Sequence, residues 1–203
     1  LYRSDDLPTD QYMAIEGANG LVAAIADAHS LERAGEKILR PLSDGRLGSA
    51  ARPYAGPVAL DGNLTEQLLA TIVDSPLFKA ADLRVAPASP GKAERLLPVL
   101  GRETATLYVN LEEARLLAME TFPDAQAAAQ ALHERGGARV LVTDGGSLAA
   151  EASAAGVFSA TPPEVAVARV TGAGDTFMAA HIAADLGGAA PQDSLNRALH
   201  AAA

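Results

Sequence analysis

The stretch Val170-Thr171-Gly172-Ala173-Gly174-Asp175-Thr176-Phe177 lies near the C-terminal end of the chain, where a strand-like run meets an Ala-rich helix. Glycines at such a junction let the backbone turn tightly and direct free N–H groups at one point. The positive end of the following helix dipole favours an anion at the same point. The sequence therefore predicts a phosphate-binding turn, with the amides of Gly172, Ala173 and Gly174 as an anion hole.

Asp175 stands where a carboxylate would repel a phosphate, which indicates a chemical use for it. If a hydroxyl attacks phosphorus, Asp175 can accept its proton while the amides absorb the developing charge. An ordinary strand-to-helix connection explains the same glycines equally well on the motif alone. A dinucleotide fingerprint fits worse, because its third glycine would fall at Phe177, and a Walker loop is excluded because the chain has no Gly-Lys-Ser/Thr.

Working outward, strand and helix patterns alternate from Pro57 onward, which is typical of a parallel sheet covered by helices on both faces. Strands are expected at Val58–Asp61, Leu83–Ala86, Ala105–Val109 and Arg139–Thr143, and helices from Thr65, around Lys92–Leu100, from Glu112, at Ala125–Arg135 and from near Ser194. Ligands of open sheets bind beyond the carboxyl ends of the strands. We expect four polar residues at such ends: Asp61, Asn110, Thr143 and Thr171.

Two hairpins complete the expected organisation. Tyr12–Glu16 and Leu21–Asp27 flank Gly17-Ala18-Asn19-Gly20, whose Asn-Gly pair is a strong hairpin signal, so an antiparallel ribbon precedes the main body. A second hairpin joins Thr143 to a strand at Leu148–Ala152. The Gly-, Ser-, Arg- and Pro-rich stretch Pro41–Pro57 is interpreted as a loop.

Asn110 and Glu113 are three residues apart at a helix start, so both side chains can face the strand end. Mg²⁺ prefers oxygen ligands and keeps several waters, so Glu113 could hold it through water while Asn110 positions a phosphate or a water. The alternative is a capping box, and the two roles can coexist. Asp144-Gly145-Gly146 is likewise open to two interpretations, a hairpin turn or a close backbone approach to a ligand.

Composition narrows the class of protein. The 203 residues are 49% hydrophobic, enough for one full core, and no apolar run reaches the length of a membrane span. The absence of Cys excludes disulfides and thiolate metal sites and fits a cytoplasmic location. A formal net charge of -9 argues against a nucleic-acid groove. The four histidines have no ligand spacing, and none is expected to bind a metal.

The octapeptide, with Met178-Ala179-Ala180 after it, resembles the C-terminal signature of the ribokinase-like (PfkB) carbohydrate kinases. Asn110-Leu111-Glu112-Glu113 resembles the family's Asn-x-x-Glu motif, and Val142-Thr143-Asp144-Gly145 resembles the strand and loop over the nucleotide. Within the family the sequence is most similar to pseudouridine kinases, through the stretches from Tyr12 to Asp27, Asp61-Gly62-Asn63 and Pro87 to Ala93.

The resemblance implies an α/β, ribokinase-like fold: a mostly parallel sheet, flanked by helices on both faces, with a small β lid. It implies one partial kinase domain over residues 1–203, with a lid hairpin at about 9–28 and a nucleotide and phosphoryl-transfer portion at about 57–203. The implied activity is ATP- and Mg²⁺-dependent phosphoryl transfer to a hydroxyl of a ribosyl-type small molecule, pseudouridine first. The alternatives are another PfkB sugar or nucleoside kinase, or a noncatalytic nucleoside-binding protein of the same fold.

The resemblance also assigns roles to residues. Asp175 is the implied catalytic base, with Gly172, Ala173 and Gly174 as the anion hole. Implied nucleotide contacts are Asn110, Thr143, Gly145 and Thr171, and Glu113 is the implied Mg²⁺ residue. Tyr12 and Asn63 are implied substrate contacts, although Tyr12 fits simple packing and Asn63 fits a helix cap with Glu66. Lys92 is interpreted as a solvated helix lysine rather than a phosphate contact.

Departures from the family pattern are visible. Tyr108-Val109 stands where Lys-Pro is common, and the loop after Thr143 is shorter or shifted. The family's Gly-Gly-rich segment, which supplies most acceptor contacts, has no counterpart here, and the chain starts at Leu1 and stops inside an expected helix, so we expect a partial chain. A homodimer through the lid and a monovalent cation beside the anion hole are further expectations from the family.

Overall fold

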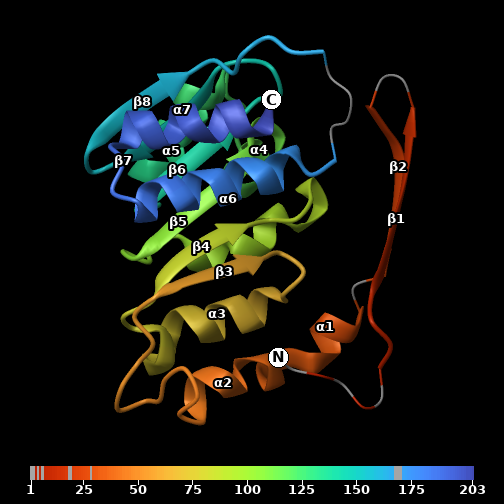
Figure 1. Ribbon diagram of the computed structural model, residues 1–203, viewed down its shortest axis with the longest axis vertical. Coiled ribbons are helices and arrows are strands. Elements are labelled where there is room, and N and C mark those ends of the chain that lie inside the picture. The colour runs from red at the N-terminus through yellow and green to blue at the C-terminus, as the bar shows by residue number, and fades with distance from the viewer. Residues whose placement is uncertain (1–2, 4, 6, 18–19, 28, 167–170) are drawn as a thin grey trace.

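The computed structural model describes residues 3, 5, 7–17, 20–27, 29–166 and 171–203, with the side chains of residues 16–21 left undescribed. A layered α/β body and a long two-stranded ribbon make up the molecule (Figure 1). The strands are β1 (Gln11–Gly17), β2 (Gly20–Asp27), β3 (Pro57–Asp61), β4 (Asp82–Ala86), β5 (Ala105–Asn110), β6 (Arg139–Thr143), β7 (Ala149–Ser153) and β8 (Gly156–Ala160).

The body is built on a six-stranded sheet with the order β3-β4-β5-β6-β7-β8. β3 to β6 pair in parallel, and β7 and β8 add to the sheet as antiparallel strands. The parallel strands and the hairpin from β6 to β7 confirm the expected fold class, whereas β8 was not expected. Parallel strands are covered on both faces, which is why the middle residues of β4, β5 and β6 are buried almost without interruption.

Alternation along each strand divides the core between the two faces. Val140 and Val142 belong to a large core shared with α3, η3, α4 and α5. Leu141 between them points to the other face and packs in a smaller core with α6 and α7. Each central strand therefore contributes apolar side chains to both layers of helices, and Figure 1 shows α6 and α7 together on one face.

Capping side chains mark the start of some of the helices. The helices are α1 (His29–Ala34), η1 (Gly35–Leu39), α2 (Arg40–Ser43), α3 (Glu66–Asp74), η2 (Pro76–Phe78), η3 (Pro90–Val99), α4 (Leu111–Ala118), α5 (Ala125–Glu134), α6 (Ala173–Leu186) and α7 (Pro191–Ala202), where η marks a 3₁₀ helix. Thr65 caps α3 by accepting a hydrogen bond from the Leu68 amide at 3.2 Å. Among the described residues no helix combines the length and apolar character needed to cross a membrane.

Two expected segments differ in detail. The helix expected around residues 92–100 is observed as the 3₁₀ helix η3, with Pro98 inside it. The expected loop over residues 41–57 begins inside α2 and then contains only an isolated bridge between Ser49 and Arg52.

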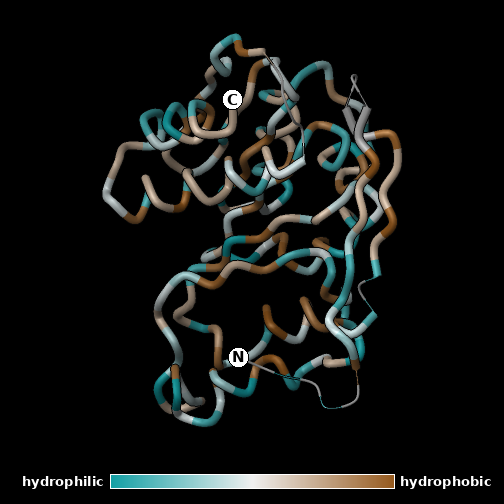
Figure 2. The backbone as a smooth tube through the Cα atoms, turned by 45° about the vertical axis from the view of Figure 1, so that its right-hand side comes forward, coloured by the Kyte–Doolittle hydropathy of each residue, from teal (hydrophilic) through white to brown (hydrophobic). Residues whose placement is uncertain are grey.

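The ribbon β1–β2 is antiparallel, as expected, with Tyr12 opposite Ala26 and an irregularity between Ile15 and Glu16. The expected turn residues Ala18 and Asn19 lie outside the described residues. The ribbon stands beside the edge of the sheet to which the parallel strands point (Figure 1), and Figure 2 shows hydrophobic residues along it. The large apolar side chains that are exposed on its described part are Tyr12, Met13, Ile15, Val22 and Ile25.

Candidate active site

The candidate site lies at the edge of the sheet where β3, β4, β5 and β6 end. Helix α6 runs back across the sheet from this edge, because Asp185 near its C-terminal end pairs with Arg84 in the middle of β4 and with Arg139 at the start of β6. The first turn of α6 therefore lies over the carboxyl ends of the strands, and the ribbon faces the same edge (Figure 1). In open α/β sheets this is the edge that binds ligands.

The turn that opens α6 has the geometry of an anion site. Gly172 is the N-cap with φ of 93°, a left-handed conformation that favours glycine, and no side chain caps the helix. The Gly172 carbonyl accepts hydrogen bonds from the Thr176 amide at 2.9 Å and the Thr176 hydroxyl at 2.8 Å. The first amides of a helix have no partner within it, so those of Ala173 and Gly174 can bind an anion.

Asp175 lies in the same first turn and is exposed to solvent. Its carboxylate is thus accessible to a hydroxyl group brought to the anion site. The strand expected just before Thr171 would include residues 167–170, which lie outside the described residues, and Thr171 itself has an interaction within the structure.

Asn110 and Glu113 form a capping box, which was one of the two interpretations that the sequence allowed. The Asn110 side chain accepts from the Glu113 amide at 2.8 Å, and Glu113 Oε2 accepts from the Asn110 amide at 2.8 Å. Glu113 is only 8% exposed, and burial raises the pKa of its carboxyl group although the Asn110 amide opposes this. A carboxylate whose charge is poorly solvated gains from a nearby cation. The cap is therefore present, and the expected metal role stays a prediction.

Asn110 and Thr143 are direct partners in the pairing of β5 with β6, so the structure brings these two expected nucleotide residues together. Beyond Thr143, the Ser147 amide donates to the Asp144 carbonyl at 2.8 Å, and Gly145 has φ of 53°. A side chain at Gly145 would meet no atom within 4 Å. The positive φ of the hairpin turn thus explains why glycine stands at position 145. The space beside Gly145 is open and could be entered by a ligand.

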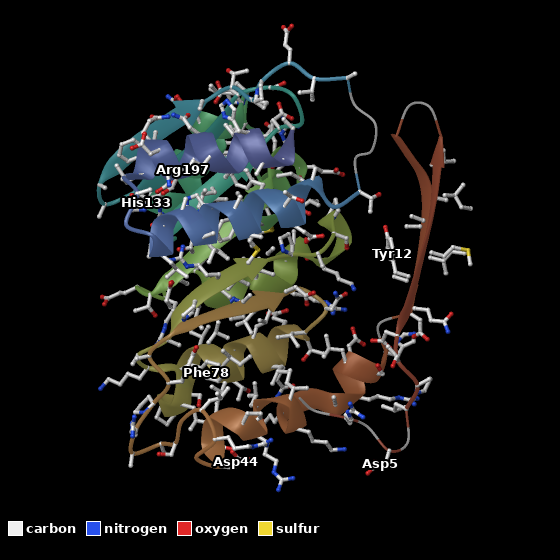
Figure 3. All side chains as sticks on the ribbon, in the orientation of Figure 1. Asp5, Tyr12, Asp44, Phe78, His133 and Arg197 are labelled. Atoms are coloured by element: carbon white, nitrogen blue, oxygen red, sulfur yellow. The ribbon has the colours of Figure 1, made fainter. Side chains whose placement is uncertain are left out.

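Asn63 and Lys92 differ from what the sequence indicated. Asn63 does not cap α3, because Thr65 is the N-cap; its side chain instead donates to Asp61 Oδ2 at 2.8 Å. Lys92 is half-buried and donates to the Asn63 side-chain oxygen, so it is not a solvated lysine. Tyr12 is 58% exposed and extends from the ribbon toward the body (Figure 3).

A buried polar network under α6 escaped the sequence analysis. His181 Nδ1 lies 2.9 Å from the Tyr108 hydroxyl, which also accepts from Arg84 Nη1 at 3.2 Å. On the other side of the ring, Nε2 lies 3.2 Å from Glu151 Oε2 and 3.3 Å from Arg139 Nη2. Burial raises the pKa of Tyr108 to about 12. The spacing of His181 and Asp185, one helical turn apart in an Ala-rich helix, was the available signal.

Among the described residues no group of three or more His, Cys, Asp or Glu side chains could hold a metal ion. A Mg²⁺ bound mainly by waters and substrate phosphates does not need such a group. Glu113 and Asn110 fit a contact of that kind, through the oxygen and amide positions that the capping box leaves free.

A mostly parallel sheet between two layers of helices, with a small antiparallel sheet beside it, defines the ribokinase-like class of α/β proteins. Residues 56–203, more than half of the chain, match the model of the pfkB family carbohydrate kinases. The chain belongs to the pfkB family of carbohydrate kinases.

Solved structures agree with this family. A carbohydrate kinase from Agrobacterium tumefaciens is 27% identical with a TM-score of 0.75, and the alignment covers 97% of this chain and 62% of that protein. An adenosine kinase from Trypanosoma brucei brucei is 15% identical, with a TM-score of 0.71 over 98% of this chain and 64% of that protein. A mutant of phosphofructokinase-2 from Escherichia coli is 19% identical, with a TM-score of 0.64 and coverages of 75% and 52%.

The chain thus spans 52% to 64% of the length of these structures. The two likenesses below 25% identity concern the fold alone. A search of curated proteins found no match.

Proposed function

We propose that the protein is an ATP-dependent kinase that transfers the γ-phosphoryl group to a hydroxyl of a ribosyl-type small molecule, with pseudouridine as the first candidate acceptor. The observation that carries this proposal is the opening turn of α6, where uncapped amides and the exposed Asp175 share one helical turn at the ligand-binding edge. Membership of a family of carbohydrate kinases supports the same reaction.

In the proposed reaction the acceptor oxygen forms a new bond to the γ-phosphorus, while the bond to the β–γ bridging oxygen breaks and ADP leaves. Asp175 takes the proton of the acceptor hydroxyl. The amides of Gly172, Ala173 and Gly174 stabilise the negative charge that builds up on the transferred group. Mg²⁺, when bound, neutralises phosphate charge; Glu113 would hold it through water, and Asn110, Thr143, Gly145 and Thr171 would contact the nucleotide.

Pseudouridine is favoured because the stretches that resemble pseudouridine kinases meet at this edge. Asp61 ends β3 and Gly62-Asn63 follows it, the stretch 87–93 follows β4, and Tyr12 extends from the facing ribbon (Figure 3). Other nucleosides and sugars remain rivals, since the solved structures of similar fold include an adenosine kinase and a phosphofructokinase. In this proposal the ribbon is the lid of one kinase domain, and Tyr12 and Asn63 contact the acceptor.

A homodimer through the lid is part of the proposal. Among the side chains of the ribbon that the structure describes, five large apolar ones are exposed, Val22 being 71% exposed and Ile25 67%. Burying such a surface against a second copy is favourable. Ile25→Lys should then convert a dimer of the full-length protein to a monomer in light scattering; a wild-type monomer at micromolar concentration would contradict this part.

The function is tested with full-length protein, ATP and Mg²⁺, and a panel of pseudouridine, uridine, adenosine, ribose and fructose. ADP release with pseudouridine well above the other acceptors is the expected result. Preference for another acceptor would replace pseudouridine within the same reaction class. Acceptor binding without any ADP release would instead support a noncatalytic nucleoside-binding protein.

A further inference from the structure

Lys92 is held in a defined position at the acceptor half of the edge. Its ammonium group, at the start of η3, is half-buried and donates to the side-chain oxygen of Asn63. A lysine ammonium has three donors and no acceptor, so one donor is used here and two can serve another group. Because lysine can only donate, the oxygen of the Asn63 amide must face it.

Asn63 is itself fixed by Asp61. The Asn63 backbone amide donates to Asp61 Oδ1 at 3.0 Å, and its side-chain nitrogen donates to Asp61 Oδ2 at 2.8 Å. The carboxylate, the amide and the ammonium therefore form a chain in which each donor and acceptor is matched. The negative charge of Asp61 offsets part of the positive charge of Lys92 through the polarised amide.

The backbone around this chain is closely packed. The Gly62 amide donates to the Ala86 carbonyl at 2.9 Å, and a side chain at Gly62 would come within 2.2 Å of the Pro87 carbonyl oxygen. Ala88 next to it has φ of 68°, an uncommon conformation for a residue other than glycine. Arg95 donates to the Gly62 carbonyl at 3.1 Å and pairs with Glu32 of α1 at 2.9 Å. The loops after β3 and β4 therefore hold Lys92 in a preorganised setting.

The position of Lys92 separates it from the expected nucleotide contacts. Asn110 and Thr143 end β5 and β6, whereas Asn63 and Lys92 follow β3 and β4 at the other half of the edge. Helix α6 crosses strands of both halves, since it contacts Arg84 of β4, Tyr108 of β5 and Arg139 of β6. A group that follows β3 and β4 thus lies on the other half of the edge from the expected nucleotide contacts, which follow β5 and β6.

We propose that Lys92 binds the acceptor, donating hydrogen bonds from its ammonium group to a neutral carbonyl or hydroxyl oxygen of that molecule. This inference rests on the proposed function and adds a residue that it did not include. An ammonium group whose charge is partly neutralised is suited to an uncharged oxygen. A triphosphate would instead be bound by cations without a neighbouring carboxylate. The carbonyl oxygens of a nucleoside base are acceptors of this kind.

The test compares Lys92→Met, which keeps the apolar stem, with Lys92→Arg, which keeps the charge, and with Lys79→Met, which removes a charge at an exposed lysine outside the edge. In the full-length protein we expect Lys92→Met to raise the acceptor KM roughly tenfold to a hundredfold, as for a lost charged hydrogen bond, with the ATP KM within about twofold. Lys92→Arg should recover part of the loss, and Lys79→Met should match the wild type.

An unchanged acceptor KM in Lys92→Met, or a parallel rise in the ATP KM, would overturn the inference. If the wild type released no ADP with any acceptor, the proposed reaction would fail by itself. Lys92 would then be tested by calorimetry with pseudouridine and with ATP. Weakened pseudouridine binding at unchanged ATP binding supports the inference, and equal binding of pseudouridine to wild type and Lys92→Met contradicts it.

Discussion

His181 Nε2 lies 3.2 Å from Glu151 Oε2, and both side chains are fully buried between α6 and β7. Glu151 also accepts from Arg139 at 2.7 Å, and Arg139 reaches Asp185 at 2.8 Å. Among the described residues no buried side-chain polar atom is left without a partner. The network therefore joins α6, the helix that begins at Gly172, to two strands through hydrogen bonds that compensate for burying the charges.

The first prediction concerns stability against pH. Burial acts to raise the pKa of Glu151, but hydrogen bonds from His181 and Arg139 outweigh it and hold that pKa below its usual value. A carboxyl group whose pKa is lower in the folded state adds stability above its unfolded pKa and loses it as the pH falls through the folded value. The free energy of unfolding should therefore decrease as the pH is lowered past about 4.

Glu151→Gln should lower the free energy of unfolding at pH 7 by about 2–3 kcal/mol and flatten this acid dependence. Urea unfolding between pH 7 and pH 3 measures both quantities. Glu134→Gln, at an exposed position in the last turn of α5, is the matched control and should change neither. An acid dependence of equal steepness in Glu151→Gln would contradict the assignment.

The second prediction concerns Asp175 as the proton acceptor. Asp175→Asn removes the base while keeping the shape of the side chain, so kcat should fall roughly 10²- to 10⁴-fold at nearly unchanged affinity for ATP. Steady-state kinetics and nucleotide calorimetry measure the two effects. Asp193→Asn is the matched control, because Asp193 is also exposed and lies in the first turn of α7. Wild-type turnover in Asp175→Asn would refute the role.

The third prediction concerns the turn before α6. Gly172→Ala places a side chain at φ of 93°, where the space is open but the backbone is strained, so it should cost about 1–2 kcal/mol of stability. Relief of that strain would turn the first amides of α6 away from the anion. We therefore expect kcat to fall by more than the loss of folded protein accounts for. Gly45→Ala is the matched control, because Gly45 also has φ of 90° and open space around it but lies in a loop far from Gly172 in the sequence.

Equal losses of melting temperature in the two glycine variants, with activity lost only in Gly172→Ala, are the expected pattern. If both variants kept full activity, the amides of the turn would not bind the transferred group.

The fourth prediction separates the two roles of Glu113. Glu113→Gln keeps an oxygen that can accept from the Asn110 amide but removes a charge whose pKa is raised by burial. Stability at pH 7 should therefore be unchanged or slightly higher, while the Mg²⁺ concentration for half-maximal activity should rise about tenfold. Glu112→Gln, at the exposed neighbour in the same first turn, is the control. An unchanged Mg²⁺ requirement in Glu113→Gln would leave the capping box as its sole role.

Local signals in the sequence determined the order of strands and helices from β3 to β6. The cap at Asn110, the buried strand runs and the glycine turn before α6 act over a few residues each, so their meaning can be recognised without the rest of the chain. The same locality explains why the parallel sheet was predicted and why β8, whose residues alternate weakly and lie half-exposed, was not.

Tertiary structure alone decided which distant residues meet. The contact of Lys92 with Asn63 joins residues 29 positions apart, and that of Arg84 with Asp185 joins residues 101 positions apart. No spacing rule connects such pairs, because their approach depends on how the strands assemble and on which face of α6 turns inward. The sequence thus predicted the glycine turn before α6 and the acid beside it, while packing decided that His181 is buried and that Lys92 contacts Asn63 at the edge where β3 and β4 end.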